Sequence, residues 1–498
     1  NWLLFGYQTM TVNAAQMAGG NALALDGLSH SVINIKGDTA SSINLSQIGD
    51  AVAISFADAS DPNVNNHNQI TLSSHAVLTM KAIQASGQYV AGAGTGTLAL
   101  VANSLAVLGG AVNLANVSSD INLTGLTGVT WRAASSKFGD SSGVITLPTL
   151  ASGQTLWLAT TQLTGGAPTV SGDTGSLLNI TGDVTTGNVD ISGLDTDIGV
   201  RFVDSSGQSR AVLISSATLT VSVGQLAGGV NFTSGQDANN AFTGTIAVKS
   251  DATANGHLAA NFNVAGVLAN LDLTNLTNLT VNGQGVLVDQ TYSVTLPQLI
   301  TGQTLSLTAA VLQTGRIDLS TSNGGTLSVV GNLTGDVDLS NLGDNVGVGL
   351  GTSASINGAF TLTSKSKAIT GRAITTTTDQ VSGAYLGTLR VADLSNNTLG
   401  GNLVLTSIAA NLDLTLLQNI VVNAQGVLVE KVNGQLTGSQ ITIGSLNAAQ
   451  TLKIDANLLT GYAFALAGAT GSKFDIEGNL THSGIIDLTS VDAHVTIG

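Results

Sequence analysis

The amino-acid sequence predicts an all-β, elongated repeat protein, and it favours a β-solenoid. Strand signals recur about every ten residues, a unit of about 147 residues repeats along the 498-residue chain, and aromatic residues make up only 4% of it. Because aromatic side chains dominate conventional cores, this chain must fill a narrow interior with Val, Leu, Ile and Ala. Tandem small β-sandwiches are the alternative, but a half-unit of about 74 residues is short for a seven-strand sandwich of roughly 100 residues.

Two motifs establish the repeat independently. The first reads aliphatic-x-Gly-Asn/Asp, followed by Ile/Val-Asp/Asn-Leu/Ile-Ser/Thr, and its glycines are 145, 149 and 147 residues apart. The second contains a glutamine that recurs at spacings of 146, 149 and 147 residues. Agreement between separate motifs indicates a structural period. The glycines are Gly37, Gly182, Gly331 and Gly478, and the glutamines are Gln8, Gln154, Gln303 and Gln450.

A third motif, Asp/Asn-Leu-Thr-x-Leu, falls between the other two, so each unit consists of two related halves. We expect a partial unit at residues 1–120, full units at 121–270 and 271–411, and a partial unit at 412–498. Repeat arrays normally end in atypical capping units, and the sequence shows none. We therefore expect the chain to be a segment of a longer polypeptide; the alternative is that uncapped ends stack head to tail between subunits.

Short runs of alternating aliphatic residues, bounded by Gly, Asn, Asp, Ser and Thr, predict the strands. Helical periodicity is limited to Ala102–Leu108 and Ser407–Leu417. Strands stacked about 4.7–4.9 Å apart would align Asn, Ser and Thr into hydrogen-bonded ladders. In one stretch the expected strands are Val294–Leu296, Leu305–Leu307, Leu327–Val330, Val337–Leu339, Val346–Leu350, Phe360–Leu362, Leu389–Val391, Leu403–Leu405, Leu412–Leu414 and Ile420–Val422.

Composition excludes several classes of function. The net charge is −15 and no run of Lys or Arg occurs, so the chain lacks the basic surface that nucleic acids or anionic membranes require. The most apolar window, Thr97–Val117, is interrupted by Asn, Ser and a Gly pair, which argues against a spanning helix. The aromatic girdles of a transmembrane barrel are missing. With no cysteine, disulfide and thiol chemistry are excluded.

No catalytic constellation is recognisable, and we expect the protein not to be an enzyme. The histidines form no HExxH pair or other metal-binding spacing. The string Asp-Thr-Gly-Ser at residues 173–176 resembles an aspartic-protease loop, but the required second Asp is absent from the matching loop of the next unit. Gly92–Gly96 lacks the Lys of a P-loop, so both stretches are interpreted as turns. The histidines are His30, His67, His75, His257, His482 and His494.

We expect no cofactor, with calcium as the open alternative, since secreted β-rolls bind it through carboxylates in repeated turns. The GGxGxDxUx repeat of those proteins is absent here. Several copies carry Asn at the acidic positions, which favours hydrogen bonding over ion binding. The candidate carboxylates are Asp195, Asp197, Asp336, Asp338 and Asp344, and the Asn equivalents include Asn44 and Asn122.

In composition and repetition the whole chain resembles repetitive bacterial extracellular proteins, namely surface-layer subunits, fibre proteins and giant-adhesin stalks. The segment Ala392–Leu403 is also similar to the core of leucine-rich repeats, but no period of 20–29 residues runs through the chain. The resemblance implies a structural protein of the extracellular space or cell surface that self-associates into a filament or layer. A stalk of a large adhesin is the alternative, and a solenoid carbohydrate-active enzyme is a third reading.

Overall fold

The computed structural model is an all-β protein, a β-solenoid of about 20 turns with 44% strand and 6% helix. It describes residues 2–4, 6–19, 22–57, 69–92, 94–132, 137–226, 232–251, 256–350, 355–480 and 484–498. His67 and His482 therefore lie outside the described residues. The fold class predicted from the sequence is confirmed. Contacts divide the chain into unit 1 (Asn1–Gly235 and Gly244–Thr253) and unit 2 (Gln236–Thr243 and Ala254–Gly498).

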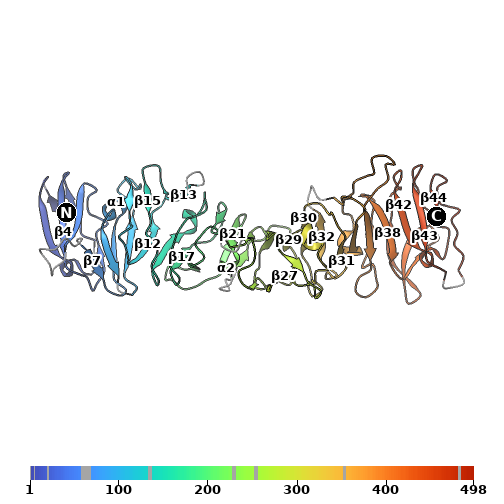
Figure 1. Ribbon diagram of the computed structural model, residues 1–498, viewed down its shortest axis with the longest axis horizontal. Helices are drawn as coiled ribbons and strands as arrows, with labels where there is room; N and C mark the ends of the chain where they lie inside the picture. The colour runs from blue at the N-terminus through green and yellow to red at the C-terminus, as the bar shows by residue number, and fades with distance from the viewer. Residues whose placement is uncertain are drawn as a thin grey trace. The chain divides into compact units, whose positions relative to one another are not determined.

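In unit 1, parallel strands form three stacked runs along the chain (Figure 1). The first run contains β2 (Thr9–Asn13), β4 (Ser31–Lys36) and β6 (Val52–Ala57). The second contains β5 (Ile43–Asn44), β8 (Val77–Lys81), β10 (Thr97–Val101), β12 (Asp120–Gly125), β16 (Thr155–Ala159), β17 (Leu177–Thr181) and β19 (Gly199–Val203). The third contains β18 (Val189–Asp190), β21 (Thr218–Ser222) and β23 (Thr245–Lys249).

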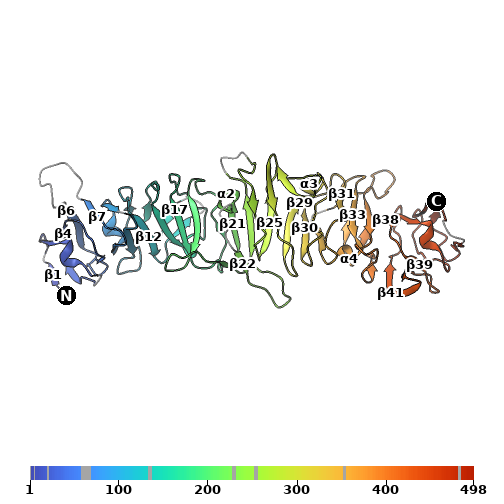
Figure 2. The ribbon, with the colours of Figure 1, turned by 90° about the horizontal axis from the view of Figure 1, so that it is seen from below.

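Unit 2 has the same parallel arrangement, and Figure 2 shows β25, β29 and β30 side by side. One run contains β25 (Asn270–Asn275), β29 (Thr304–Thr308), β30 (Thr326–Val330) and β32 (Gly347–Leu350). The other contains β31 (Val337–Leu339), β33 (Thr361–Lys365), β35 (Thr388–Ala392), β38 (Asn411–Leu416), β42 (Thr451–Asp455), β43 (Lys473–Glu477) and β44 (Thr496–Ile497). New parallel sheets start at β5, at β18 and at β31, none of which joins the parallel sheet that precedes it.

Smaller sheets complete the turns, and three of them contain an antiparallel hairpin at matching places in successive repeats. These hairpin sheets are β11 (Val112–Asn113) with β13 (Thr130–Arg132), β14 (Lys137–Gly139) and β15 (Val144–Thr146); β24 (Phe262–Asn263) with β26 (Thr280–Val281), β27 (Leu287–Asp289) and β28 (Tyr292–Thr295); and β36 (Leu403–Val404) with β39 (Ile420–Val422), β40 (Leu428–Val432) and β41 (Gln435–Thr442). The parallel pairs are β1 (Trp2–Leu4) with β3 (Leu25–Gly27), β7 (Gln69–Leu72) with β9 (Tyr89–Gly92), β20 (Val212–Ile214) with β22 (Phe232–Ser234), and β34 (Ile374–Thr375) with β37 (Ile408–Ala409).

The helices are single turns that follow strands at a corner. None of those that the structure describes is long and apolar enough to cross a membrane. The α-helices are α1 (Ala82–Ala85), α2 (Val223–Leu226), α3 (Ala309–Leu312) and α4 (Ser366–Ile369), and the 3₁₀ helices are η1 (Ala14–Met17), η2 (Thr160–Gln162) and η4 (Ala456–Leu459).

All ten strands predicted at 294–422 coincide with or overlap strands of the structure. The two suggested helices are wrong. Residues 102–108 form a turn in which Asn103 Oδ1 accepts hydrogen bonds from the backbone of Leu105 and Val107. Residues 407–417 contain β37 and the whole of β38. The periodicity of a short apolar run does not distinguish a helix from a strand. In this structure β37 and β38 pair with strands of neighbouring turns.

Columns of aliphatic side chains form the core. Alternate residues of each strand point inward, and parallel in-register pairing stacks them from turn to turn. In unit 2, Leu271, Leu305, Leu327 and Val348 occupy one such column, and each is at most 2% exposed. Burying one Leu or Val contributes about 1.5–3 kcal/mol. The repeated column explains how the chain forms a core with few aromatic residues.

The repeated Asp/Asn-x-Ser/Thr signature forms the corners. Oδ1 of Asp or Asn accepts a hydrogen bond from the backbone N–H two residues later, which is an Asx turn. In most copies a Ser or Thr hydroxyl at that later position donates to the same oxygen, as Thr274 does to Asp272 at 2.6 Å. Since only an oxygen is required, Asp and Asn are interchangeable. The turns are centred on Asn44, Asn113, Asn122, Asp190, Asn263, Asp272, Asp318, Asp338, Asp413, Asp455 and Asp487.

The repeated glutamine joins one turn to the preceding turn. Gln303 is 1% exposed, and its Nε2 donates to the carbonyl oxygens of Val267 (3.0 Å) and Ala269 (2.9 Å). Its Oε1 accepts from the N–H of Ile300. Gln154 and Gln450 make the same three kinds of hydrogen bond. One amide thus satisfies backbone groups of two turns in a place that water does not reach.

A second side-chain bridge between turns uses asparagine in two copies and aspartate in one. Oδ1 of Asn270 and Oδ1 of Asn411 each accept from the backbone N–H of a Thr in the next long strand, and their Nδ2 atoms donate to a carbonyl. Unit 1 has Asp120 at this position, where Oδ1 accepts from Thr155. Burial raises the pKa of Asp120, although the Thr155 hydrogen bond opposes the shift.

We predict that Gln303→Ala lowers the free energy of unfolding by about 2–4 kcal/mol, because it leaves three buried backbone groups without partners. Gln284→Ala changes an exposed side chain of the same unit and should shift stability by less than about 0.5 kcal/mol. Urea denaturation of both variants measures the difference. Equal effects of the two substitutions would contradict the bridging role.

We predict that Asp120→Asn raises stability by about 1 kcal/mol near neutral pH, because a buried carboxylate becomes the amide that the other copies use. A raised folded-state pKa means that the wild type gains stability as the pH falls through that value. The advantage of Asn should therefore shrink between neutral pH and a pH close to 3.8, the ordinary pKa of this carboxyl. Urea denaturation at both pH values tests this, with Asn411→Asp as the reciprocal variant expected to lose stability.

Candidate functional site

The carboxylates proposed for calcium are engaged with protein groups. Asp195 accepts from the N–H of Asp197 (3.3 Å), and Asp197 accepts from the Thr174 hydroxyl (2.6 Å). Asp336 Oδ1 binds the N–H of Thr361 (2.7 Å), and the Asx turn of Asp338 was described above. Within the described ranges, no three His, Cys, Asp or Glu side chains gather as a metal site.

The other stretches examined for chemistry form turns and local pairs. In the Asp-Thr-Gly-Ser string, the carbonyl of Asp173 accepts from the N–H of Ser176. In the glycine-rich stretch, Thr95 Oγ1 accepts from the N–H of His75 (3.1 Å). The ring of His30 stacks on Tyr7, and His494 Nδ1 lies 2.7 Å from Asp492. These contacts bring no catalytic groups together.

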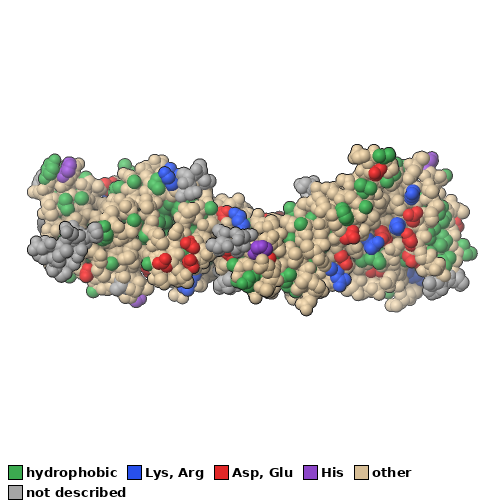
Figure 3. Space-filling model, in the orientation of Figure 1, with side chains coloured by type: hydrophobic (Ala, Val, Ile, Leu, Met, Phe, Trp, Pro, Cys, Tyr) green, Lys and Arg blue, Asp and Glu red, His purple; other side chains and the backbone are tan. Residues whose placement is uncertain are grey.

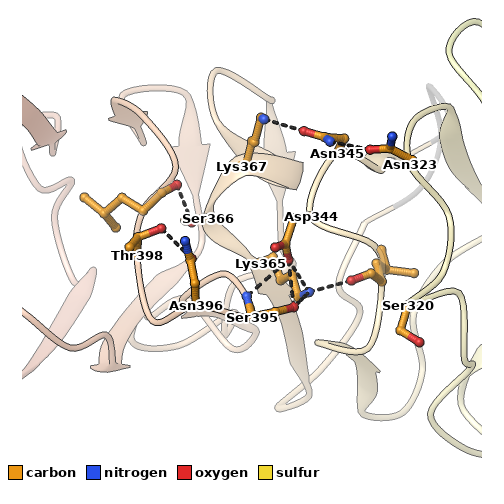
Figure 4. A network of polar contacts seen from close by, with 12 residues as sticks. Ser320, Asn323, Asp344, Asn345, Lys365, Ser366, Lys367, Ser395, Asn396 and Thr398 are labelled. Carbon is orange, nitrogen blue, oxygen red and sulfur yellow. Dashed lines mark hydrogen bonds and ion pairs between the residues drawn. The ribbon is translucent and has the colours of Figure 1, made fainter.

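A polar cluster of unit 2 joins the loop between β31 and β32 to the end of β33 and to the loop that follows β35 (Figure 4). It contains Lys365, the last residue of β33, whose side chain is 7% exposed. Lys365 Nζ donates to the Leu342 carbonyl (2.5 Å), to Asp344 Oδ1 (2.7 Å) and to Ser395 Oγ (3.0 Å). Ser395 in turn donates to Asp344 at 2.9 Å. All three protons of the ammonium group therefore have acceptors.

The same cluster occurs in the first repeat. Lys81, at the end of β8, donates to the Ile48 carbonyl (2.6 Å) and to Asp50 Oδ1 (2.5 Å), and the Ser104 hydroxyl donates to Asp50. In the second repeat the strand β21 ends in Ser222 instead of lysine. Sequence reasoning missed both lysines, because each ends its strand at the parity that points outward in the rest of that strand, although the structure buries it.

The geometry makes this cluster an anchor and not a Ser–Lys catalytic dyad. A lysine that activates serine must be neutral in order to accept its proton, whereas Lys365 is paired with a carboxylate. Burial by itself would raise the pKa of Asp344, but hydrogen bonds from Lys365 and Ser395 outweigh it and lower the pKa below 3.8. The carboxylate therefore stabilises the fold above its ordinary pKa, and this contribution is lost as the pH falls through the lowered value.

A second set of carboxylates anchors the loops that precede the hairpin sheets. Asp140, Asp289 and Glu430 each accept a hydrogen bond from the backbone N–H of a leucine 31 or 32 residues earlier in the chain. Asp289 also lies 2.9 Å from His257 Nδ1. These carboxylates hold loops against the hairpins.

Asp393 has a strongly raised pKa. Burial is the main cause that raises its pKa to about 6; the hydrogen bond from the Gln418 N–H opposes the shift, and the charge of Glu430 adds to it. Such a pKa suits a general base. The hydrogen bonds of Asp393 and Glu430, however, go to backbone amides and to the Thr437 hydroxyl, which is the pattern of a loop anchor.

No protein-family model matches this chain, and neither the curated proteins nor the solved structures contain a significant match to it.

We predict that Asp344→Ala lowers the free energy of unfolding by about 3–5 kcal/mol, because it leaves the buried Lys365 ammonium without its counter-ion. The double variant Asp344→Ala/Lys365→Met should be more stable than Asp344→Ala alone, because no unpaired charge remains. Lys367→Ala is the matched control, since Lys367 is an exposed lysine of α4. Urea denaturation gives all values, and additive effects of the two cluster substitutions would rule out the anchor.

Proposed function

We propose that this protein is a non-catalytic structural repeat protein that forms or extends a bacterial surface layer or extracellular filament by self-association. The observation that carries the proposal is the role of its polar side chains. Asx turns, glutamine bridges and lysine–carboxylate clusters bind the protein's own backbone. Side chains at these positions maintain the solenoid, which is the requirement of a scaffold.

The outer face of the long sheet in unit 2 supports lateral packing. One row across the strands contains Asp272, Ser306, Ser328 and Gly349, which are in register. Three of these four side chains are very small, so a second surface can approach the sheet closely. Close approach of complementary surfaces is what an interface core requires.

The neighbouring long sheet of unit 2 carries charges of both signs on its outer face. Its row reads Asp338, Thr363, Arg390, Asp413, Lys453 and Asp475 in register. Arg390 Nε lies 2.7 Å from Asp413, and Lys453 lies 3.0 Å from Glu477. Figure 3 shows acidic and basic side chains interleaved over this part of the molecule. Local neutralisation reduces the like-charge repulsion that opposes association.

A stalk of a large adhesin is the alternative structural role, and it differs in its prediction for solution behaviour. A stalk spaces a binding head and stays monomeric, whereas a filament or layer subunit associates as its concentration rises. Both roles place the protein outside the cell, and both use the solenoid for mechanical extension.

We predict concentration-dependent assembly of the isolated chain, measured by sedimentation velocity and negative-stain electron microscopy. Ser306→Lys/Ser328→Lys should abolish it by placing two positive charges on the small-residue row. Gln284→Lys, on an exposed loop of the same unit, should leave assembly intact. Monomers at every concentration would contradict self-association and favour the stalk, and equal assembly of the double variant would exclude this row as the interface.

A further inference from the structure

A cavity of about 690 Å³ lies on the outer face of the long sheet of unit 1. Its lining comes from β8, β10, β12, β16, β17 and β19, together with the loops that follow β17 and β19. At about 4.8 Å per strand, six neighbouring strands extend over roughly 24 Å. The cavity therefore crosses the strands and has room for an extended ligand.

Trp157 is the aromatic side chain of this cavity. Its neighbours Leu156 and Leu158 are fully buried, whereas Trp157 points to the outer face and is half-buried. The matching third residues of β29 and β42 are Ser306 and Lys453, so the repeat itself does not require an aromatic residue here. The large apolar ring at this outward position occurs in one of the three copies, so the packing of the solenoid does not explain it.

The loop after β19 is built to cover one edge of this ring. Gly207 has a φ of +83°, and a Cβ at this position would lie 2.8 Å from Trp157 Cη2. Asp204 fixes the loop by accepting from the N–H groups of Ser206 (2.8 Å) and Gln208 (3.0 Å). Glycine thus permits both the backbone conformation and the close approach. The loop thus lies against one edge of the ring, and Trp157 still lines the cavity.

Polar side chains around Trp157 make hydrogen bonds within the protein, and each keeps a further donor or acceptor atom that could bind a ligand. Asn122 Oδ1 accepts from Thr124, which leaves the Nδ2 donor for another partner. Arg210 Nη1 pairs with Asp183 Oδ1 at 2.7 Å, and the Leu213 N–H binds the same oxygen. Asp183 Oδ2 and Arg210 Nη2 make no hydrogen bond to the described residues. Donors and acceptors are therefore positioned in advance, which lowers the entropic cost of binding.

We propose that this cavity binds a neutral polysaccharide strand. The C–H face of a sugar ring carries partial positive charge and packs on the negative π face of an indole, while its hydroxyl groups both donate and accept hydrogen bonds. The charged lining residues are Asp183, Asp204 and Arg210, a net charge of −1, so phosphorylated or polyanionic ligands are disfavoured. A purely apolar ligand would leave the polar atoms without partners.

This proposal is independent of the scaffold role. The cavity lies in unit 1, whereas the rows proposed for self-association lie in unit 2. Glycan binding would give the solenoid a contact with cell-wall or capsular polysaccharide. The ion pair of Asp183 with Arg210 orients the ligand in this scheme, and no bond is broken.

The test is binding of the full chain to cello-, xylo-, malto- and chito-oligosaccharides, followed by tryptophan fluorescence and isothermal titration calorimetry. We expect at least one probe to bind the wild type. Trp157→Ser introduces the residue type found at the matching position of β29, Ser306, and should weaken binding at least tenfold. Trp157→Phe should retain part of it. Tyr462→Ala is the control, because it removes an aromatic side chain that is 60% exposed and remote from the cavity residues in the sequence.

Several results would overturn the proposal: no binding of any neutral oligosaccharide or of the matching polymers, unchanged affinity of Trp157→Ser, or a stronger affinity for a polyanion such as polygalacturonate. Circular dichroism confirms that Trp157→Ser is folded. Assembly of this variant, measured by electron microscopy, should equal that of the wild type, so failure of glycan binding and failure of self-association are distinguished.

Discussion

The corners of a parallel β-solenoid place backbone groups where no strand can pair with them, and the structure depends on how those groups are satisfied. A buried amide or carbonyl without a partner costs about 1–3 kcal/mol, and a long solenoid repeats this problem at every turn. Two devices solve it here. The Asx turn satisfies the N–H at the bend, and the buried glutamine satisfies carbonyls of the preceding turn, as Gln303 does for Val267 and Ala269. Aliphatic columns can then stack in register.

The repeats share these devices and differ in what they add. Lys81 and Lys365 fill the same corner in the first and third repeats, and the second has Ser222 there. Asp120 replaces an asparagine of the other copies, and burial raises its pKa. Trp157 takes the position of Ser306 and Lys453. Positions that hold the backbone carry similar side chains in the copies compared, whereas the outward position of Trp157 carries a different residue in each.

Much of the fold followed from the sequence, because its evidence is local. The Asp-Leu-Ser core around Asp338 marks a corner wherever it occurs, and the alternation at Leu305 and Leu307 marks a strand. The possible helix at 102–108 was wrong because a seven-residue apolar run does not distinguish a helix from a turn held by Asn103. The candidate sites were harder to predict. Lys365, Asp344 and Ser395 are far apart in the sequence, and Trp157 becomes notable only when its face and its cavity are known.

The sequence by itself predicted the β-solenoid class and the 147-residue period and contained the corner signature and the low content of charged residues, because each depends on residue type and spacing along the chain. Only the tertiary structure decided which lysines are buried, where the parallel runs break and restart, and which outward side chains share a cavity. Those properties depend on the register between strands from distant turns. Register follows from the packing of whole turns against one another, and no single segment contains that information.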